Sequence, residues 1–443
     1  MDTPIAGFVE RYAAQGTARF HMPGHKGMPV LGCERLDITE IAGADALYEA
    51  DGIIAQSEVN AASLFGSQRT FYSTEGSSQC LKAMLYLALT GRPAGTPPVI
   101  VAARNVHRAF VHAAALLDFE TVWLWPEERN SLCACPVSPR QLEETLIALP
   151  APPAAVYITS PDYLGGMADI AALAQVCHRR GTVLLVDNAH GAYLHFLKPA
   201  MHPLDLGADL CCDSAHKTLP VLTGGAYLHV GKRAPQAFAE NGKAALALFG
   251  STSPSYLTLT SLDLCNRYLA GGYGGRLADT AARMEALRGT LRAAGWQTER
   301  SDPLRLTLRA PAGINGMELA QRLRQGGVEC EFADPEFLVL MATPENSLKE
   351  FSRVAAVLGE NRAPAETAPP LPLARGERVM SIRQALFAPH KRIPAGESLG
   401  KVCGVPTVAC PPAIPIAVSG ERIGPEAVVL FAHYGVQEVD VLI

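Results

Sequence analysis

Two short segments of the chain carry side chains that could do covalent chemistry. The sequence DNAHG at 187–191 and the sequence SAHK at 214–217 each follow an apolar run typical of a β-strand. A lysine such as Lys217 can form an imine with an aldehyde, and a carboxylate such as Asp187 can keep a pyridine nitrogen protonated. This pair suits one cofactor, pyridoxal phosphate (PLP), which supplies an electron sink while the protein positions it.

Each of these residues also has a simpler interpretation when it is taken alone. Lys217 would be a solvated surface charge in most proteins, and Asp187 could cap the helix that follows it. However, the apolar strand before Lys217 predicts a buried position, and burial lowers the pKa of an amine, as imine formation requires. Together the two residues favour cofactor chemistry more than either does alone.

Two histidines could contact the ring of such a cofactor. His190 could donate a hydrogen bond to its phenolic oxygen, and Ala189 would then lie against one face of the ring. His107, just after the apolar run at 98–103, could stack on the other face. A core histidine and a surface-loop histidine are the ordinary alternatives for these two positions.

A phosphate group would need a cradle of donors. The helix start at Gly76, Ser77 and Ser78 combines a glycine with two hydroxyls, and the free N–H groups of a helix start attract an anion. An ordinary serine cap is the alternative. Ser214 could add a hydroxyl, and His216 could face the phosphate or a substrate carboxylate. Nucleotide binding has little support, because neither a P-loop nor a GxGxxG motif after a strand is present.

The bulk composition indicates a soluble globular protein of two or three domains. The chain has 443 residues, of which 48% are hydrophobic and 18% are charged, and its net charge of −5 argues against a dedicated nucleic-acid binder. No apolar run of membrane-spanning length and no signal peptide are visible, so no membrane partner is expected. The eleven cysteines lack CxxC spacing, which predicts reduced thiols, a cytoplasmic location and no metal site.

Apolar runs that alternate with helical spacing predict an α/β fold with a mostly parallel sheet. We expect strands at 98–103, 120–125, 154–159, 182–187, 209–213 and 225–230, and helices at 77–90, 138–149 and 168–180. The short gap between the last two strands suits a hairpin-like return, with Lys217 in its loop. Further on, we expect helices at 276–294 and 317–325 and strands at 304–308 and 337–341.

These patterns divide the chain into four parts. An irregular N-terminal arm at 1–75 precedes a PLP-binding large domain at 76–275 and a smaller α/β domain at 276–362. A linker rich in proline and alanine at 363–372 leads to a C-terminal α+β segment at 373–443.

Six segments together resemble one protein family. The chain is similar to the Orn/Lys/Arg decarboxylases, which are fold type I PLP-dependent enzymes related in fold to aspartate aminotransferase. The matching segments are FHMPGHKG at 20–27, GSS at 76–78, RNVH at 104–107, DNAHG at 187–191, SAHK at 214–217, and PPAIP at 411–415 through GE at 420–421.

The resemblance implies a role for each matching residue. Lys217 would form the imine with the cofactor, Asp187 would pair with the ring nitrogen, and His107 would stack on the ring. Glu421 matches a glutamate of the family that lies near the distal end of the substrate. The segment at 251–256, which contains Ser253, resembles a family segment that lies near the active site at the dimer interface. The implied catalytic residues are Lys217, His216, Asp187 and His107, and the implied cofactor-binding residues are Gly76, Ser77, Ser78, His107, Asp187, Ala189, His190, Ser214, His216 and Lys217.

The chain also departs from the family pattern. Ala215 stands where the family more often has threonine, Asn188 stands where an acidic residue is common, and Cys410 replaces a usual tyrosine. The C-terminal segment is short, and the chain begins almost at the arm, which suggests a short form without the receiver-like domain of the large members. These departures leave the identity of the substrate open.

The resemblance implies α-decarboxylation of a small-molecule substrate, a basic amino acid (lysine, arginine or ornithine), to an amine of polyamine biosynthesis and CO2. A homodimer is expected, because sites of this fold type usually draw residues from two subunits. Two alternatives stay open: a PLP-dependent aminotransferase or lyase acting on another amino acid, and a PLP-binding relative that has lost catalysis. Product analysis separates them, because only a decarboxylase releases CO2 with the amine.

Overall fold

A computed structural model gives the positions of most of the chain. It describes residues 1–92, 94–127, 131–311, 313–360, 371–408 and 412–443. Most of the linker predicted at 363–372 lies outside the described residues, and so do Cys410 and Pro411 of the proline-rich segment.

Seven strands form one mixed sheet in the order β1-β7-β6-β5-β4-β2-β3. The six strands predicted from apolar runs are all present, and they are joined by a seventh, β1. The bounds are β1 Arg69–Ser73, β2 Val99–Ala103, β3 Glu120–Leu124, β4 Ala155–Thr159, β5 Val183–Asp187, β6 Leu210–Asp213 and β7 Ala226–Val230.

The direction of the strands explains where the two chemical segments lie. Strands β5 and β6 are parallel neighbours, with Asp187 opposite Cys212, so both strands end at the same edge of the sheet. Strand β7 is antiparallel to β6 and to β1, which confirms the predicted hairpin-like return. Lys217 does not lie in an open loop as predicted, because the connection contains a one-turn helix, α7 (Ala215–Thr218).

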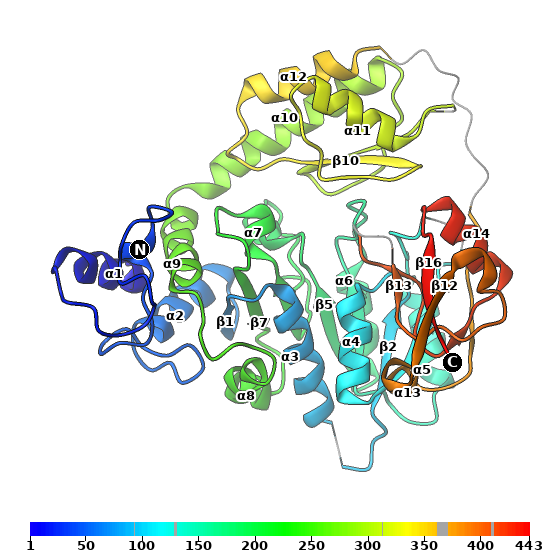
Figure 1. Cartoon of the computed structure of the whole chain (residues 1–443), viewed down its shortest axis with the longest axis horizontal. Coiled ribbons are helices and arrows are strands. Elements are labelled where there is room, and N and C mark those ends of the chain that lie inside the picture. The colour runs from blue at the N-terminus through cyan, green and yellow to red at the C-terminus, as the bar shows by residue number, and fades with distance from the viewer. Residues whose placement is uncertain (93, 128–130, 312, 361–370, 409–411) are drawn as a thin grey trace. The chain divides into compact units, whose positions relative to one another are not determined.

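Helices precede or follow most of these strands, and the three predicted around the sheet are present. Helix α3 packs against β5, β6 and β7, with α8 beside it (Figure 1). The bounds are α3 Ser77–Thr90, α4 Arg108–Leu117, α5 Pro139–Ala148, α6 Ile170–Arg179, α8 Gln236–Ala247 and α9 Tyr256–Ala270.

The N-terminal arm is less irregular than predicted. It contains helix α1 (Pro4–Ala14), helix α2 (Ile53–Phe65) and strand β1, which pairs with β7. Helix α1 forms because Ile5 and Val9, spaced by four residues, lie on one face that packs against α9. Only the stretch between α1 and α2 matches the expected irregular chain, with a single 3-10 turn at Glu34–Leu36.

The contacts between residues divide the chain into two compact units. Each unit is built from separated parts of the sequence. The first unit comprises Met1–Pro97, Leu146–Ile158 and Asp169–Gly275, and the second comprises Pro98–Thr145, Thr159–Ala168 and Arg276–Ile443. The four consecutive segments expected from the sequence do not coincide with these units, and their boundaries stay a prediction.

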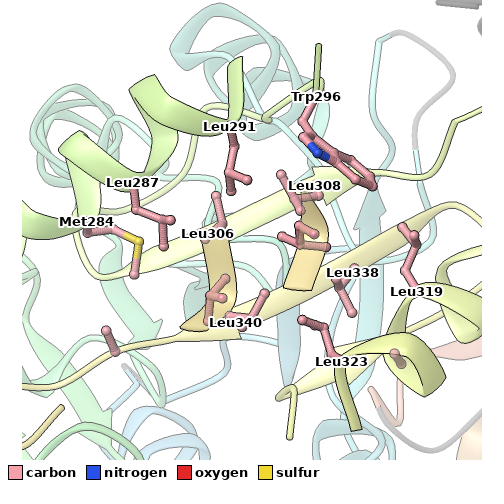
Figure 2. Packing of buried hydrophobic residues seen from close by; sticks show 14 residues of the cluster. Met284, Leu287, Leu291, Trp296, Leu306, Leu308, Leu319, Leu323, Leu338 and Leu340 are labelled. Atoms are coloured by element: carbon pink, nitrogen blue, oxygen red, sulfur yellow. The ribbon is translucent and has the colours of Figure 1, made fainter. Parts of the chain in front are cut away.

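The second unit contains a small α/β layer with its own apolar core. Leucines of β8 and β10 face helices α10 and α11, and Figure 2 shows Leu306 and Leu308 among Met284, Leu287 and Leu291. The core forms because alternate residues of each strand point to one face while the helix residues recur every three or four positions. The elements of this layer are α10 Tyr273–Ala293, β8 Arg305–Arg309, α11 Gly316–Gln325, β9 Phe332–Ala333, β10 Phe337–Met341 and α12 Leu348–Leu358.

The C-terminal part of the second unit mixes short strands and helices, as expected for an α+β segment. Its strands pair antiparallel as β11 with β15, β12 with β16, and β13 with β14. The bounds are β11 Glu377–Arg378, α13 Ile382–Phe387, β12 His390–Pro394, β13 Thr407–Val408, β14 Pro415–Ala417, β15 Glu421–Arg422, α14 Pro425–His433 and β16 Glu438–Leu442. In the part of the chain that the structure describes, no helix has the length and apolarity to cross a membrane.

Candidate active site

Asp187 ends strand β5 and is held in a buried position by hydrogen bonds, the longest of which comes from Sγ of Cys212 at 3.8 Å. The hydroxyl of Tyr157 donates to its Oδ2 at 3.0 Å, and the backbone N–H of Ala189 donates to its Oδ1 at 3.2 Å. Burial raises the pKa of Tyr157 well above its ordinary value, and the Asp187 carboxylate adds to this effect. Tyr157 therefore stays protonated and keeps the carboxylate oriented, as pairing with a ring nitrogen requires.

Lys217 and His190 meet at the same edge of the sheet. The Nζ atom of Lys217 lies 2.7 Å from Nε2 of His190, and His190 belongs to the turn that begins at Asp187. Lys217 itself is exposed, which corrects the expectation of a buried amine. The reason is its place on α7, a single turn just beyond the buried end of β6.

His216 is half-buried and holds a defined proton. Its Nδ1 lies 3.0 Å from the carbonyl oxygen of Gly225, and a carbonyl can only accept, so Nδ1 carries the hydrogen. Burial lowers the pKa of His216, although the bond to Gly225 opposes this shift. In its neutral form His216 therefore presents an unprotonated Nε2, which can accept a hydrogen bond but cannot donate one.

The start of α3 has the features of a phosphate cradle. The hydroxyl of Ser214 donates to that of Ser77 at 2.7 Å, so residues far apart in sequence bring two hydroxyls together. Gly76, the residue before the helix, has φ of 73°, a left-handed conformation that favours glycine. Among the described residues, the N–H groups of Ser77 and Ser78 have no hydrogen-bond partner, so they can bind an anion.

The segment at 251–256 lies beside this cradle. The backbone N–H of Ser251 donates to Oε1 of Glu75 at 2.7 Å, directly before Gly76. Ser253 donates its own N–H to the Ser251 hydroxyl and is exposed. The predicted role of Ser253 stays a prediction.

His107 and Glu421 belong to the second unit. His107 precedes α4, and its Nδ1 accepts a hydrogen bond from the N–H of Ala109 at 3.2 Å. Glu421 is buried, and its Oε2 accepts from the N–H of Val418 at 2.9 Å and lies 3.4 Å from Nη2 of Arg104. Burial raises the pKa of Glu421, while Arg104 opposes this shift. The stacking role of His107 and the substrate role of Glu421 stay predictions.

The structure also reveals partners that the sequence did not. Tyr157 orients Asp187, and Arg104 supplies a cation to Glu421 while its guanidinium lies over the rings of Trp123 and Trp125. A signal existed for Tyr157, because a tyrosine in an otherwise apolar buried strand needs a partner for its hydroxyl. No local pattern pointed to the Arg104 pair, whose members are separated by most of the chain.

Comparison with known proteins identifies the family. Residues 3–310 match the family model "Orn/Lys/Arg decarboxylase, major domain". The uncharacterized protein YaaO of Bacillus subtilis is 29% identical over 97% of this chain and 93% of its own length, and an arginine decarboxylase of Halalkalibacterium halodurans is 28% identical over 95% and 91%. The crystal structure of the Francisella novicida lysine decarboxylase LdcF has the same fold, with a TM-score of 0.83 at 15% identity over 100% of this chain and 81% of that one. The chain therefore belongs to the Orn/Lys/Arg decarboxylase family and is a decarboxylase.

Proposed function

We propose that this decarboxylase uses PLP to remove the α-carboxylate of lysine, arginine or ornithine, giving the corresponding amine and CO2. The observation that carries the proposal is the convergence of Lys217, His190, Asp187 and the open start of α3 at one edge of the sheet. The relatives named arginine decarboxylase support a basic amino acid as substrate.

The side chains at this edge fit PLP in their chemistry. Lys217 is the amine that would hold the aldehyde, and Asp187 is the carboxylate that would pair with the ring nitrogen. Ala189 would lie against one face of the ring and His190 would bond its phenolic oxygen, and the family resemblance adds His107 as the residue that would stack on the other face. The phosphate would bind the N–H groups of Ser77 and Ser78 and the hydroxyls of Ser77, Ser78 and Ser214. When bound, PLP accepts the electron pair that remains on the α-carbon after CO2 leaves.

The hydrogen-bonding groups of Lys217 and His216 indicate which of the two delivers a proton to the α-carbon. Cleavage of the bond between the α-carbon and the carboxylate leaves an electron pair that a proton must take up. His216 has a lowered pKa and a bare Nε2, so at neutral pH it has no proton to give on that side. We therefore assign delivery of the proton to Nζ of Lys217, whereas His216, which can only accept at Nε2, has no hydrogen bond to give to the departing carboxylate.

Glu421 is the candidate partner for the cationic end of the substrate. Its carboxylate already has Arg104 as a counter-ion in the same unit, so a substrate cation would have to share this carboxylate with the arginine. A buried charge without a partner costs several kcal/mol, so a carboxylate at this end favours basic over neutral substrates.

The expected homodimer is part of the proposal. The arm between α1 and α2 exposes large apolar side chains, with Phe20 97%, Val30 81% and Leu31 86% exposed, and Lys217 is exposed in the single chain. A second copy that covered the arm would remove this apolar surface from water. The predicted cytoplasmic location agrees with the absence of disulfides among the ten cysteines described.

Product analysis tests the proposed reaction. The PLP-loaded protein is incubated with lysine, arginine and ornithine in turn, and the evolved CO2 and the amine are measured. We expect equal amounts of CO2 and amine from at least one of the three, and none from the Lys217→Ala variant. A keto acid without CO2, or a wild-type protein that binds PLP but releases CO2 from none of them, would contradict the proposal.

A further inference from the structure

Asp213 ends strand β6 directly before Ser214, and no step proposed above uses it. Its side chain is fully buried. Its Oδ1 accepts a hydrogen bond from Nδ2 of Asn188 at 2.7 Å, and its Oδ2 accepts one from Nε2 of His202 at 3.0 Å. Nε2 of His229 lies 3.3 Å from the same Oδ2. We propose that Asp213 is a positioning residue that fixes both ends of the cofactor site, a proposal that rests on the proposed PLP site.

Asn188 connects Asp213 to the ring end of the site. It directly follows Asp187 and is fully buried. Its backbone N–H donates to the carbonyl of Cys212 at 3.0 Å, and its own carbonyl accepts from the N–H of Gly191 at 2.8 Å. With its side chain on Asp213, Asn188 is held at three points, and this fixes the backbone next to Asp187.

Ser214 connects Asp213 to the phosphate end. It follows Asp213 in the chain, and its hydroxyl donates to the hydroxyl of Ser77 at the start of α3. The placement of one buried carboxylate therefore affects both the Asp187 turn and the pair of serine hydroxyls. A change at Asp213 or Asn188 should alter cofactor binding without touching any group that contacts the cofactor.

Two histidines keep Asp213 ionised and in place. Burial alone would raise the pKa of Asp213, but His202 and His229 outweigh it and hold the pKa well below its ordinary value. Nδ1 of His229 in turn bonds the hydroxyl of Thr70 in β1 at 2.8 Å, and the ring of Phe65 lies 4.6 Å from the His229 ring. An amide at position 188 suits this fixed anion, because an acidic side chain there would face it directly.

The same cluster has the donor types of a metal site, but its hydrogen bonds argue against one. Donor atoms of His202, Cys211 and Asp213 all lie within 4.8 Å of one another. The N–H of Leu204 donates to Nδ1 of His202 at 3.3 Å, so the proton of the neutral ring is on Nε2, which faces Asp213. A metal ligand would need a lone pair at Nε2, and a metal-bound histidine donates its other N–H instead of accepting there.

An exchange of charge between positions 188 and 213 tests the proposal. Asn188→Asp places a second carboxylate against Asp213, and adding Asp213→Asn restores one carboxylate and one amide. Asp209→Asn is the matched control, because Asp209 is also a buried carboxylate that accepts from a histidine, His178 at 3.0 Å, but it lies at the opposite end of β6. PLP dissociation constants come from titration of the apo-proteins, with circular dichroism as the check on folding, and the absorbance of bound PLP and kcat are also measured.

We expect Asn188→Asp to raise the PLP dissociation constant at least about tenfold, to shift the absorbance of bound PLP and to lower kcat more than it changes KM. The double variant and Asp209→Asn should stay within about threefold of the wild type. If Asn188→Asp does not fold, Asn188→Ala is measured in its place. We expect this variant to raise the PLP dissociation constant about threefold or more.

The proposal is overturned if folded Asn188→Asp, or its substitute Asn188→Ala, binds PLP like the wild type. It is also overturned if the folded double variant binds as weakly as Asn188→Asp, or if mass spectrometry finds a stoichiometric metal that Asp213→Asn loses. Failure of the wild type itself to bind PLP is a different result, because it removes the proposed function.

Discussion

At the scale of single residues, the site depends on side chains that hold other side chains. Asp187 can pair with a ring nitrogen only if its carboxylate points in one direction, and that direction is set by the Tyr157 hydroxyl and the Ala189 N–H. His216 shows the same principle, because its bond to the Gly225 carbonyl determines which ring nitrogen carries the proton. The sequence predicted candidate residues for the site, and that assignment stays a prediction, but it did not predict these partners.

Tyr157→Phe should weaken the site without unfolding the protein. The variant keeps the buried ring and removes the hydroxyl that donates to Asp187, and a hydrogen bond to a charged group contributes about 1.5–3 kcal/mol. We expect the PLP dissociation constant to rise about tenfold in a titration of the apo-protein. Tyr163→Phe is the control, since its hydroxyl donates to the Glu331 carboxylate in the second unit. Equal PLP affinity of Tyr157→Phe and the control would contradict this role.

At the scale of elements, strong local patterns predicted the fold and weak ones did not. Strands β2 to β7 and helix α3 were predicted because buried strands of a parallel sheet are near-continuous apolar runs and α3 repeats its apolar residues at helical spacing. Strand β1 was missed because Arg69–Ser73 carries more polar than apolar residues and is placed by pairing with β7 and by packing against α2. The turn of helix at α7 was missed because four residues are too few to show a period.

The start of α3 gives a prediction for phosphate binding. Ser77→Ala and Ser214→Ala each remove one hydroxyl of the bonded pair while the backbone N–H groups remain. We expect each variant to raise the PLP dissociation constant about three- to tenfold and the double variant to raise it further. Ser138→Ala, which removes the serine that caps α5 in the second unit, is the control and should leave PLP binding unchanged.

The turn between β9 and β10 gives a prediction for stability against pH. Burial raises the pKa of Asp334 from 3.8 to about 7, although the N–H groups of Glu336 and Phe337 donate to its Oδ1 and oppose the shift. Because the unfolded chain releases this proton near pH 4 and the folded chain does not until about pH 7, the carboxyl lowers stability as the pH rises through this window.

Asp334→Asn should therefore stabilise the protein at pH 8 and not at pH 4. We expect the free energy of unfolding, from urea titrations, to exceed that of the wild type by roughly 1–3 kcal/mol at pH 8 and to converge with it toward pH 4. The exposed Asp279→Asn in α10 is the control and should show no such trend. If Asp334→Asn raises the free energy of unfolding by the same amount at every pH, the charge of Asp334 is not the cause of the stabilisation.

At the scale of the whole molecule, the candidate residues come from both compact units. Lys217, Asp187, His190 and the serines belong to the first unit, whereas His107 and Glu421 belong to the second. Spacing along the chain could not predict this division, because each unit is assembled from separated segments. The family resemblance could name all of these residues because it rests on sequence motifs, which can be compared without knowing which residues are in contact.

The exposed arm predicts that the active protein is a dimer. Light scattering should give about twice the 47.1 kDa of one chain. Replacing exposed Phe20 and Leu31 together by serine should shift the mass toward that of one chain and lower the activity. Val429→Ser, which changes an apolar residue on α14 that is 53% exposed, is the control and should keep the mass of the wild type. A fully active protein with the mass of one chain would contradict the prediction.

The central claim is that the amine of Lys217 holds PLP. Borohydride reduction of the PLP-loaded protein makes that bond permanent, and mass spectrometry of the digested protein locates it. We predict one reduced adduct per chain, on the peptide that contains Lys217, and none in Lys217→Ala. An adduct on another lysine, or a catalytically active protein without any adduct, would contradict the account.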